Sequence, residues 1–253
     1  MNENEQIKQH LRTLKLSGIR DYLETRLVEA NTNQLSFTEF LNAILLDEIE
    51  TRKQNKLNRL ISLAQIGSEA TLENFDFKFS PHFPVAHIKS LTTGEFLNKG
   101  ENIIFLGPTG TGKTHLAKAL CHQVCRQYRS ALFKSFFQFF KELKMMDIQG
   151  KLDQYLKKLI KVDLLVIDDF AFRKIDATET ELFYYIIDQR YQTKSMILTS
   201  NRALSDWGSI FPDPITSNAI MDRLAHNAHQ IVMKGESYRK KQIPENQNAR
   251  VQK

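Results

Sequence analysis

The sequence predicts an α/β protein in which a parallel sheet is flanked by helices and preceded by a small all-α N-terminal domain. Apolar residues recur at helical spacing through the first 66 residues, whereas later apolar runs are short and alternate with longer helical patterns. A glycine-rich segment, 107–112, joins the first short run to the helix after it. Strands that alternate with helices pair in parallel and are buried on both faces. A chain of 253 residues has room for one such core and a smaller appendage.

The expected N-terminal domain covers residues 1–66 and is helical. It contains no proline and a single glycine, and its charge is near neutral. Ser36 and Glu39 have the spacing of a capping box at a helix start, and residues 31–33 fit the turn before it. The apolar positions at helical spacing are Leu11, Leu14, Ile19, Leu23, Leu27, Phe37, Phe40, Leu41, Ile44, Leu45 and Ile49. These faces indicate a packing surface, and we expect the domain to contact a partner, DNA or other copies of the chain.

Glycine, proline and phenylalanine interrupt the pattern over residues 67–100, which are therefore expected to be a linker and entry segment. The α/β core is expected over residues 101–235 and is too short to carry a full lid domain after Asn201. Its expected strands lie at 102–106, 131–133, 164–167 and 196–198, with a helix at 179–191. Residues 236–253 have few apolar side chains and are expected to form a basic, flexible tail.

Composition excludes several classes of protein. The chain carries 35 Lys and Arg against 29 Asp and Glu, a net charge of +6 that hints at a polyanionic partner. Its two cysteines, Cys121 and Cys125, lack the matching Cys or His pair of a zinc site and are too few for a disulfide scaffold. The N-terminus lacks the pattern of a signal peptide, and no apolar run is long enough to span a membrane. We therefore expect a cytoplasmic protein with no membrane partner.

The segment between the first strand and its helix matches the phosphate-loop pattern G-x-x-x-x-G-K-[ST] at every fixed position. Its residues are Gly107, Pro108, Thr109, Gly110, Thr111, Gly112, Lys113 and Thr114. Glycines let backbone N–H groups close around a phosphate, and the helix N-terminus adds a favourable dipole. Lys113 is expected to reach the β- and γ-phosphates of ATP, and Thr114 to coordinate Mg²⁺. The alternative, a glycine-rich turn with no ligand, does not explain why the motif lies between a strand and a helix.

Two carboxylates, Asp168 and Asp169, follow the apolar run 164–167. Ligands in open α/β sheets bind at the carboxyl ends of the strands, so both acids belong to the expected nucleotide site. Asp168 is the candidate Mg²⁺ residue, and Asp169 is the candidate general base that activates water. The alternative is that these acids only cap the next helix.

Asn201 follows the apolar run 196–198 by a few residues and is the third candidate at this edge of the sheet. An amide there could sense the γ-phosphate or orient the attacking water. Asparagine is common in turns, so the signal depends on its order in the chain after the phosphate loop and the two acids.

The ordered set GPTGTGKT, LLVIDD and ILTSN resembles an AAA+ ATPase. Several stretches resemble the IstB-like transposition helper ATPases, relatives of the DnaC helicase loaders. They are LKLSGIRDYLETR, SFTEFLNAILLDEIETRKQNKLNRLI, GENIIFLGPTGTGKTHLA, DLLVIDDF, AIMDRLAHNAH and GESYRK, and they run from residue 11 to residue 240. The phosphate loop is shared by many NTPases, whereas the N-terminal helical stretch and the last two stretches are more discriminating.

The resemblance implies that Arg223 is an arginine finger that reaches the γ-phosphate of a neighbouring subunit. Without the resemblance, Arg223 reads as a surface helix residue. Arg239 is either a second phosphate-sensing arginine or part of a basic tail. Asp169 stands where most AAA+ members have Glu, and its shorter side chain predicts slow turnover.

Positive charge is concentrated in residues 118–161, which hold ten basic side chains against three acidic ones. The resemblance implies that this insertion lines a nucleic-acid channel, where contacts to phosphates are sensitive to salt and tolerant of sequence. The candidate DNA contacts are Lys144, Lys151, Lys157, Lys158 and Lys161. A solvated helix face is the alternative for these lysines.

The favoured hypothesis is an ATP- and Mg²⁺-dependent ATPase that binds double-stranded DNA, assembles with other copies of itself and assists a cognate transposase. A replicative helicase loader of the DnaC type is the alternative within the same fold, and the choice of partner would lie in the N-terminal domain. A P-loop small-molecule kinase leaves the lysine-rich insertion unexplained. A binding module that has lost ATPase activity is disfavoured by the intact Lys113, Thr114, Asp168 and Asn201.

Overall fold

The computed structural model describes residues 3–67, 70–77, 84–235 and 237–238 of the chain. The chain divides into two compact units, Met1–Arg59 and Leu60–Lys253. The expected helical domain, 1–66, therefore includes residues that pack in the second unit. In the described residues, no helix is both long enough and apolar enough to cross a membrane.

The first unit is built from helices α1 (Glu3–Thr13), α2 (Ser17–Asn33) and the first part of α3 (Phe37–Ala64). Its buried core is small, consisting of Leu11, Ile19 and Leu23 with partly buried neighbours. Gly18 allows α2 to approach α3 closely, because a Cβ there would lie 2.7 Å from the Asp47 carbonyl oxygen. The buried Glu48 carboxylate then accepts hydrogen bonds from the first backbone N–H groups of α2, at 2.7 Å from Gly18.

The turn between α2 and α3 was predicted in part. The capping box is confirmed, since the Ser36 N–H donates to Glu39 at 2.8 Å and the Glu39 N–H donates to the Ser36 hydroxyl at 3.3 Å. The expectation that residues 31–33 form the turn is wrong, because they belong to the last turn of α2. The chain reverses instead at Gln34, whose φ of 52° is left-handed, a conformation that ends many helices.

The second unit contains a five-stranded sheet in the order β2-β3-β4-β1-β5, and every neighbouring pair is parallel. Its strands are β1 (Asn102–Leu106), β2 (Ala131–Ser135), β3 (Leu164–Asp168), β4 (Ser195–Ser200) and β5 (Ala228–Val232). The four expected strands are confirmed, and β5 was missed. As an edge strand, β5 is largely half-buried or exposed and lacks the continuous apolar run of the central strands.

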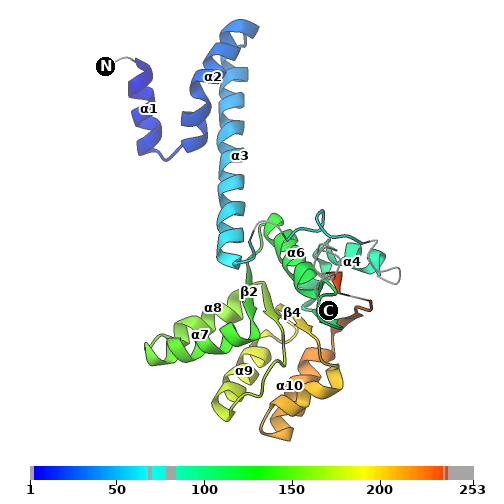
Figure 1. Ribbon diagram of the computed structural model, residues 1–253. Coiled ribbons are helices and arrows are strands. Elements are labelled where there is room, and N and C mark those ends of the chain that lie inside the picture. The colour runs from blue at the N-terminus through cyan, green and yellow to red at the C-terminus, as the bar shows by residue number, and fades with distance from the viewer. Residues whose placement is uncertain (1–2, 68–69, 78–83, 236, 239–253) are drawn as a thin grey trace, which may run out of the picture. The chain divides into compact units, whose positions relative to one another are not determined.

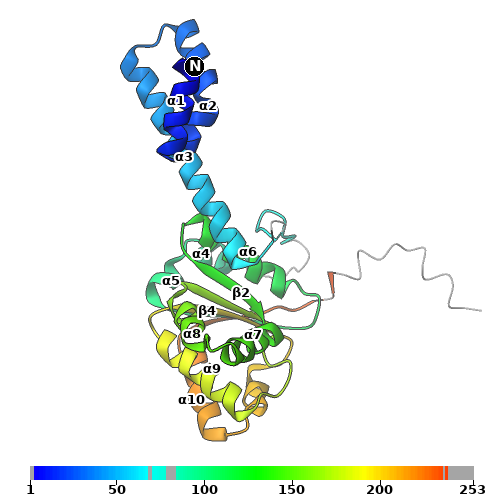
Figure 2. The same cartoon turned by 90° about the vertical axis from the view of Figure 1, so that its left-hand side faces the viewer.

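Helices cover both faces of this sheet (Figures 1 and 2). On one face, α6 (Lys113–Arg126) contacts β1, β2, β3 and β4. On the other, the large apolar core joins the sheet to α7 (Phe136–Ile148), α8 (Leu152–Lys161), α9 (Ala177–Arg190), a 3-10 helix (Leu204–Ile210) and α10 (Pro214–Ala225). The expected linker contains two short helices, α4 (Val85–Leu91) and α5 (Glu95–Lys99). Because β1, β3 and β4 are parallel neighbours, their carboxyl ends lie together on the same side of the sheet.

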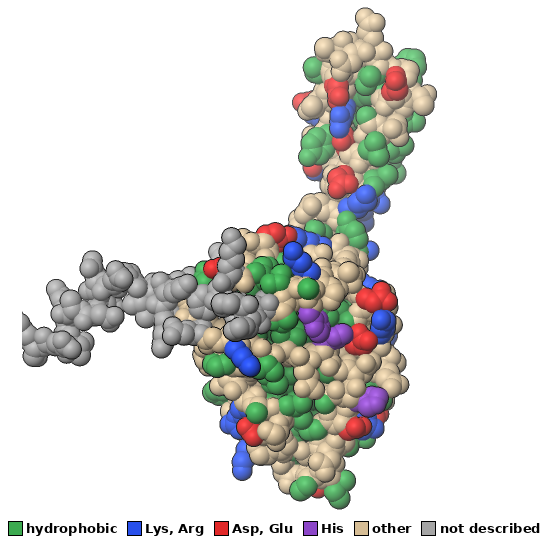
Figure 3. Space-filling model, turned by 90° about the vertical axis from the view of Figure 1, so that its right-hand side faces the viewer, with side chains coloured by type: hydrophobic (Ala, Val, Ile, Leu, Met, Phe, Trp, Pro, Cys, Tyr) green, Lys and Arg blue, Asp and Glu red, His purple; other side chains and the backbone are tan. Residues whose placement is uncertain are grey.

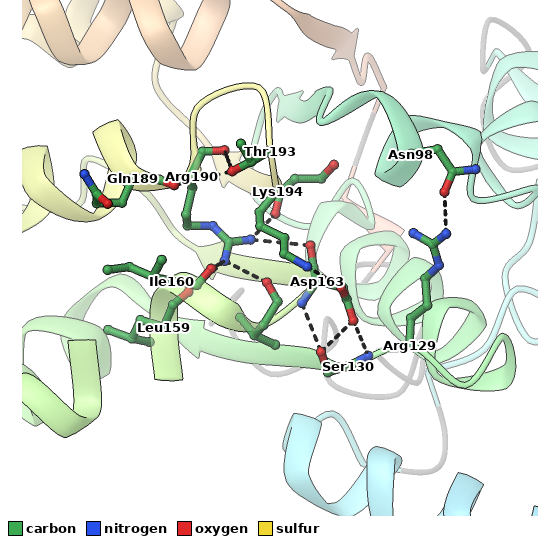
Figure 4. Close-up of polar contacts among 12 residues, drawn as sticks. Asn98, Arg129, Ser130, Leu159, Ile160, Asp163, Gln189, Arg190, Thr193 and Lys194 are labelled. Carbon is green, nitrogen blue, oxygen red and sulfur yellow. Dashed lines mark hydrogen bonds and ion pairs between the residues drawn. The ribbon is translucent and has the colours of Figure 1, made fainter. Parts of the chain in front are cut away.

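A buried arginine at the end of α9 ties α8 to the sheet. The Arg190 guanidinium donates to backbone carbonyl oxygens of Leu159 at 2.7 Å, Val162 at 2.8 Å and Ser195 at 2.5 Å (Figure 4). The first two carbonyls lie at the end of α8, where no further helical N–H can satisfy them. Arg190 therefore anchors α8, and with it the lysines that α8 carries.

Candidate functional site

The phosphate loop has the backbone geometry that its glycines predict. Gly107, Gly110 and Gly112 all have positive φ angles, of 143°, 85° and 93°. A Cβ at Gly107 would lie 2.2 Å from the Met233 carbonyl oxygen, so no other residue fits there without moving the chain. Pro108 and Thr109 are exposed at the tip of the loop. The loop leads directly into α6, whose first residue is Lys113.

Lys113 folds back over its own loop. Its ammonium group donates to the carbonyl oxygens of Gly107 and Pro108, each at 2.7 Å, and the residue is only 6% exposed. The Thr111 hydroxyl also donates to Pro108, at 2.9 Å. Phosphate oxygens carry more charge than carbonyl oxygens and form stronger bonds with an ammonium group. The loop is thus shaped around a cation that an incoming phosphate can engage.

Asp168 and Thr114 meet beside this loop, as their positions in the sequence predicted. The Thr114 hydroxyl lies 2.9 Å from Asp168 Oδ1, and the Thr199 hydroxyl lies 2.5 Å from the same oxygen. Burial raises the pKa of Asp168, and the charge of Asp169 raises it further, while the two hydroxyl bonds and Lys118 oppose the shift. A carboxylate and a hydroxyl are oxygen donors that fit Mg²⁺, which usually completes its shell with water and phosphate.

Asp169 and Asn201 lie at the same edge of the sheet. Asp169 directly follows β3 and Asn201 directly follows β4, and these strands are neighbours in register. Both side chains are exposed. Asp169 has a left-handed φ of 54°, a strained conformation that is held by a 3.0 Å bond from its N–H to the Thr199 hydroxyl. The Gly107 N–H donates to the backbone carbonyl oxygen of Ser200, the residue before Asn201, at 3.2 Å.

Thr199 is a site residue that sequence analysis missed. It is fully buried on β4, and its hydroxyl joins Asp168 to the backbone of Asp169. Such a hydroxyl orients a carboxylate without touching the ligand. The available signal was a polar residue inside an otherwise apolar strand, where an unpaired hydroxyl would be costly.

A small cavity of about 80 Å³ lies beside the loop and was not anticipated. Its lining combines the expected linker, the phosphate loop and the expected tail: Asn74, Phe75, Asp76, Thr111, Gly112, His115 and Tyr238. The Tyr238 N–H donates to the Gly110 carbonyl oxygen at 2.9 Å, and a His115 ring nitrogen lies 3.0 Å from the Thr71 carbonyl oxygen. Segments that flank the core in sequence thus help to form the site.

The structure does not bring Arg223 to the phosphate loop of its own chain. Arg223 lies near the end of α10, and the neighbouring Leu224 carbonyl oxygen accepts a 3.2 Å bond from Asn102, the first residue of β1. The phosphate loop follows the last residue of β1, at the opposite edge of the sheet. A strand of five residues separates these edges by roughly 16 Å. Arg239, the second candidate arginine, lies outside the described residues.

The candidate DNA contacts are all exposed, on or next to α7 and α8: Lys144, Lys151, Lys157, Lys158 and Lys161. Another lysine of this segment, Lys134, is buried and bonds Gln65 and Glu142, at 2.9 and 2.5 Å. Figure 3 shows the face that lies on the right of Figure 1, away from these two helices, and Lys and Arg side chains are scattered there among acidic ones. The exposed lysines of α7 and α8 are thus open to solvent, whereas Lys134 of the same segment is not.

Comparison with known sequences matches nearly the whole chain to one protein family. The profile of the family described as IstB-like ATP binding protein matches residues 9–246. An insertion-sequence protein of Mycobacterium tuberculosis, named for ATP binding, is 38% identical over 94% of this chain and 95% of its own length. The corresponding proteins of insertion sequence IS232 from Bacillus thuringiensis and IS21 from Pseudomonas aeruginosa are 34% and 33% identical. They cover 94% and 92% of this chain, and 95% and 88% of their own lengths.

Comparison with solved structures finds proteins of similar fold over 62–71% of the chain. A DnaI structure has a TM-score of 0.56 at 22% identity and covers 71% of this chain and 98% of its own. The DnaC helicase loader has a TM-score of 0.51 at 25% identity, covering 62% of this chain and 95% of its own. DnaA bound to AMPPCP and single-stranded DNA has a TM-score of 0.55 at 22% identity, covering 68% and 52%. All three have a fold similar to that of this chain.

Proposed function

Since the chain belongs to the family of IstB-like ATP-binding proteins and its core has the P-loop AAA+ fold, we propose that it hydrolyses ATP, assembles on double-stranded DNA and assists a transposase. The observation that carries the ATPase proposal is the meeting of Lys113, Thr114 and Asp168 at one edge of the sheet. Phosphoryl transfer from ATP in this fold requires a lysine that binds the phosphates, and a hydroxyl and a carboxylate that hold the metal ion.

The reaction would proceed by positioning and electrostatics. Lys113 would exchange its two carbonyl partners for the β- and γ-phosphate oxygens. Thr114 and Asp168 would hold Mg²⁺, which neutralises developing charge on the phosphates when bound. Asp169 would take a proton from the attacking water while Asn201 orients that water, since both side chains are exposed at this edge. Because the Asp169 side chain is one methylene shorter than Glu, we expect slow turnover.

Arg223 would complete the site from a neighbouring subunit. It cannot serve its own nucleotide, because it lies at the opposite end of the strands, but its side chain is 25% exposed and reaches the surface. A guanidinium supplied in trans makes hydrolysis depend on assembly. Arg239 would be a further phosphate sensor or part of the basic tail.

DNA and a transposase are proposed as partners on separate grounds. The exposed lysines of α7 and α8 offer contacts to phosphates, which do not depend on base sequence. The transposase is inferred from the relatives, which belong to insertion sequences and match more than nine-tenths of this chain. A helicase loader is the second candidate, favoured by the likeness to the DnaC structure. It predicts binding to a hexameric helicase in place of a transposase.

The proposal is tested by measuring ATP hydrolysis with and without duplex DNA. We expect the rate to rise on adding DNA and to fall to background in Lys113→Ala, which loses the cation for the phosphates. Lys174→Ala, a change at an exposed lysine of the same unit, is the matched control and should hydrolyse normally. A rate that ignores DNA but rises with a small phosphate acceptor would contradict the proposal and favour a kinase.

A further inference from the structure

The side chain of Arg223 contacts α9, the residue that follows α9, and the preceding turn of its own helix, α10. One guanidinium nitrogen lies 2.9 Å from Asp188 Oδ1, and another donates to the Ala219 carbonyl oxygen at 3.3 Å. The guanidinium carbon lies 5.1 Å from the ring centre of Tyr184 and 5.9 Å from that of Tyr191. The cation is thus bordered by a carboxylate and two aromatic rings.

These contacts fix the orientation of the side chain more than they stabilise the fold. The side chains of Arg223 and Asp188 are 25% and 39% exposed, and ion pairs that are partly open to solvent add little to the stability of a fold. An arginine has five N–H donors in a rigid plane, and a carboxylate at one edge with rings nearby sets the direction of that plane. A flexible side chain held in this way loses less entropy when it meets a phosphate.

We propose that Asp188 is a positioning residue for Arg223, holding its guanidinium at the subunit surface in the orientation that meets the terminal phosphate bound by the next subunit. This inference rests on the proposed role of Arg223 in trans. Asp188 itself touches no nucleotide in this scheme, since it lies on α9 beside Arg223 and not beside the phosphate loop. The competing explanation is that the ion pair only joins α10 to α9.

The two explanations are separated by mixing two variants and measuring hydrolysis. The Arg223→Ala variant should bind ATP but lacks the arginine finger. The Lys113→Ala variant lacks the lysine that binds the phosphates but keeps the arginine finger. In a mixture, ATP is hydrolysed only where Lys113→Ala donates its arginine to Arg223→Ala. Asp188→Ala is then introduced into the Lys113→Ala donor, so the subunit that binds ATP is unchanged.

We expect the Asp188→Ala donor to lower kcat of the mixture by roughly tenfold to a hundredfold, since misplacing a catalytic group by about 1 Å can cost about a hundredfold. KM should stay constant because the ATP-binding subunit is unaltered. Asp188→Glu in the donor should restore part of the activity. Glu181→Ala, two turns earlier on α9 and exposed, is the matched control and should leave kcat unchanged.

Other outcomes overturn the inference in distinguishable ways. A mixture with the Asp188→Ala donor that is as fast as the unmodified mixture, or faster, means that Asp188 joins helices or restrains the finger. The less disruptive Asp188→Asn donor, checked by thermal unfolding, guards against loss of the fold. If the unmodified mixture shows no hydrolysis beyond its separate components, the trans role of Arg223 fails and the inference fails with it.

Discussion

Asp168, which we propose to be a metal ligand, is buried at a cost to the stability of the fold. It is 6% exposed, and two threonine hydroxyls bond its carboxylate. These bonds do not offset burial, since burial is the main cause of its raised pKa. A carboxyl group whose pKa is higher in the folded state destabilises the fold once pH rises above its ordinary value. A bound cation would remove that penalty, as expected of a metal ligand.

Replacing Asp168 by Asn should therefore stabilise the protein while weakening its binding to ATP and Mg²⁺. The gain in melting temperature should be present at pH 7 and should disappear as pH falls below the ordinary pKa of an aspartate, where the wild-type carboxyl is protonated in both states. Thermal unfolding at pH 7 and pH 3 measures it, with Asp147→Asn on the surface of α7 as control. A lower melting temperature than wild type at pH 7 would show that the threonine bonds outweigh burial.

At the scale of elements, the lysines of residues 134–161 fall into two groups. Lys134 is buried under α7 and α8, whereas the lysines on α7 and α8 themselves are exposed. Lys134 on β2 is neutralised by Glu142 of α7, and the Tyr155 hydroxyl of α8 bonds the same carboxylate at 2.5 Å. Burial raises the pKa of Glu142, but its hydrogen bonds, chiefly those from Lys134 and Tyr155, and the charge of Lys134 together lower it by more, so the net shift is downward. The internal pair therefore holds the two helices on the sheet, and the exposed lysines remain free to face a polyanion.

Charge reversal of Lys144 and Lys157 should weaken duplex DNA binding and reduce its dependence on salt. Each lost phosphate contact lowers the slope of log affinity against log salt by about 1. Fluorescence anisotropy over a salt series measures both quantities. Lys99→Glu, a change at an exposed lysine that lies on α5 and outside α7 and α8, is the control. Equal slopes for wild type and the double variant would assign these lysines to a solvated surface.

At the scale of the molecule, two units of unequal core share one chain. The first unit, Met1–Arg59, has three buried apolar residues at its centre, whereas the second has a sheet with apolar packing on both faces. Small cores give marginal stability. The residues proposed to bind the nucleotide all belong to the second unit, so a ligand that binds the folded state should stabilise that unit first.

Calorimetric unfolding is therefore expected to show two transitions, the lower one from the first unit. ATP with Mg²⁺ should raise the upper transition by several degrees and leave the lower one unchanged, because only the second unit gains binding free energy. The Lys113→Ala variant should show no shift and serves as control. If both transitions move together, or only one is seen, the units unfold as a single cooperative structure through α3.

Prediction from the sequence succeeded where a signal is local. The four inner and edge strands with apolar runs were placed within a few residues, and so was α9, which begins two residues before the expected helix. The capping box at Ser36 was also found. Edge strand β5 was missed because its residues alternate little and are mostly not buried. Thr199, Phe75 and Tyr238 were missed because their roles depend on residues far away in the chain.

The amino-acid sequence by itself determined the fold class and the phosphate loop, because strand periodicity and the loop motif act through residues that are neighbours in the chain. Only the tertiary structure decided which distant residues meet at that loop, among them Asp168 with Thr199, since strand order sets this. It also decided that Arg223 lies beside Asp188, near the amino end of β1 and therefore far from the phosphate loop at the carboxyl end of β1. A local pattern carries no information on which edge of a sheet a later helix will reach, and that placement is what makes the arginine a candidate to act on another subunit.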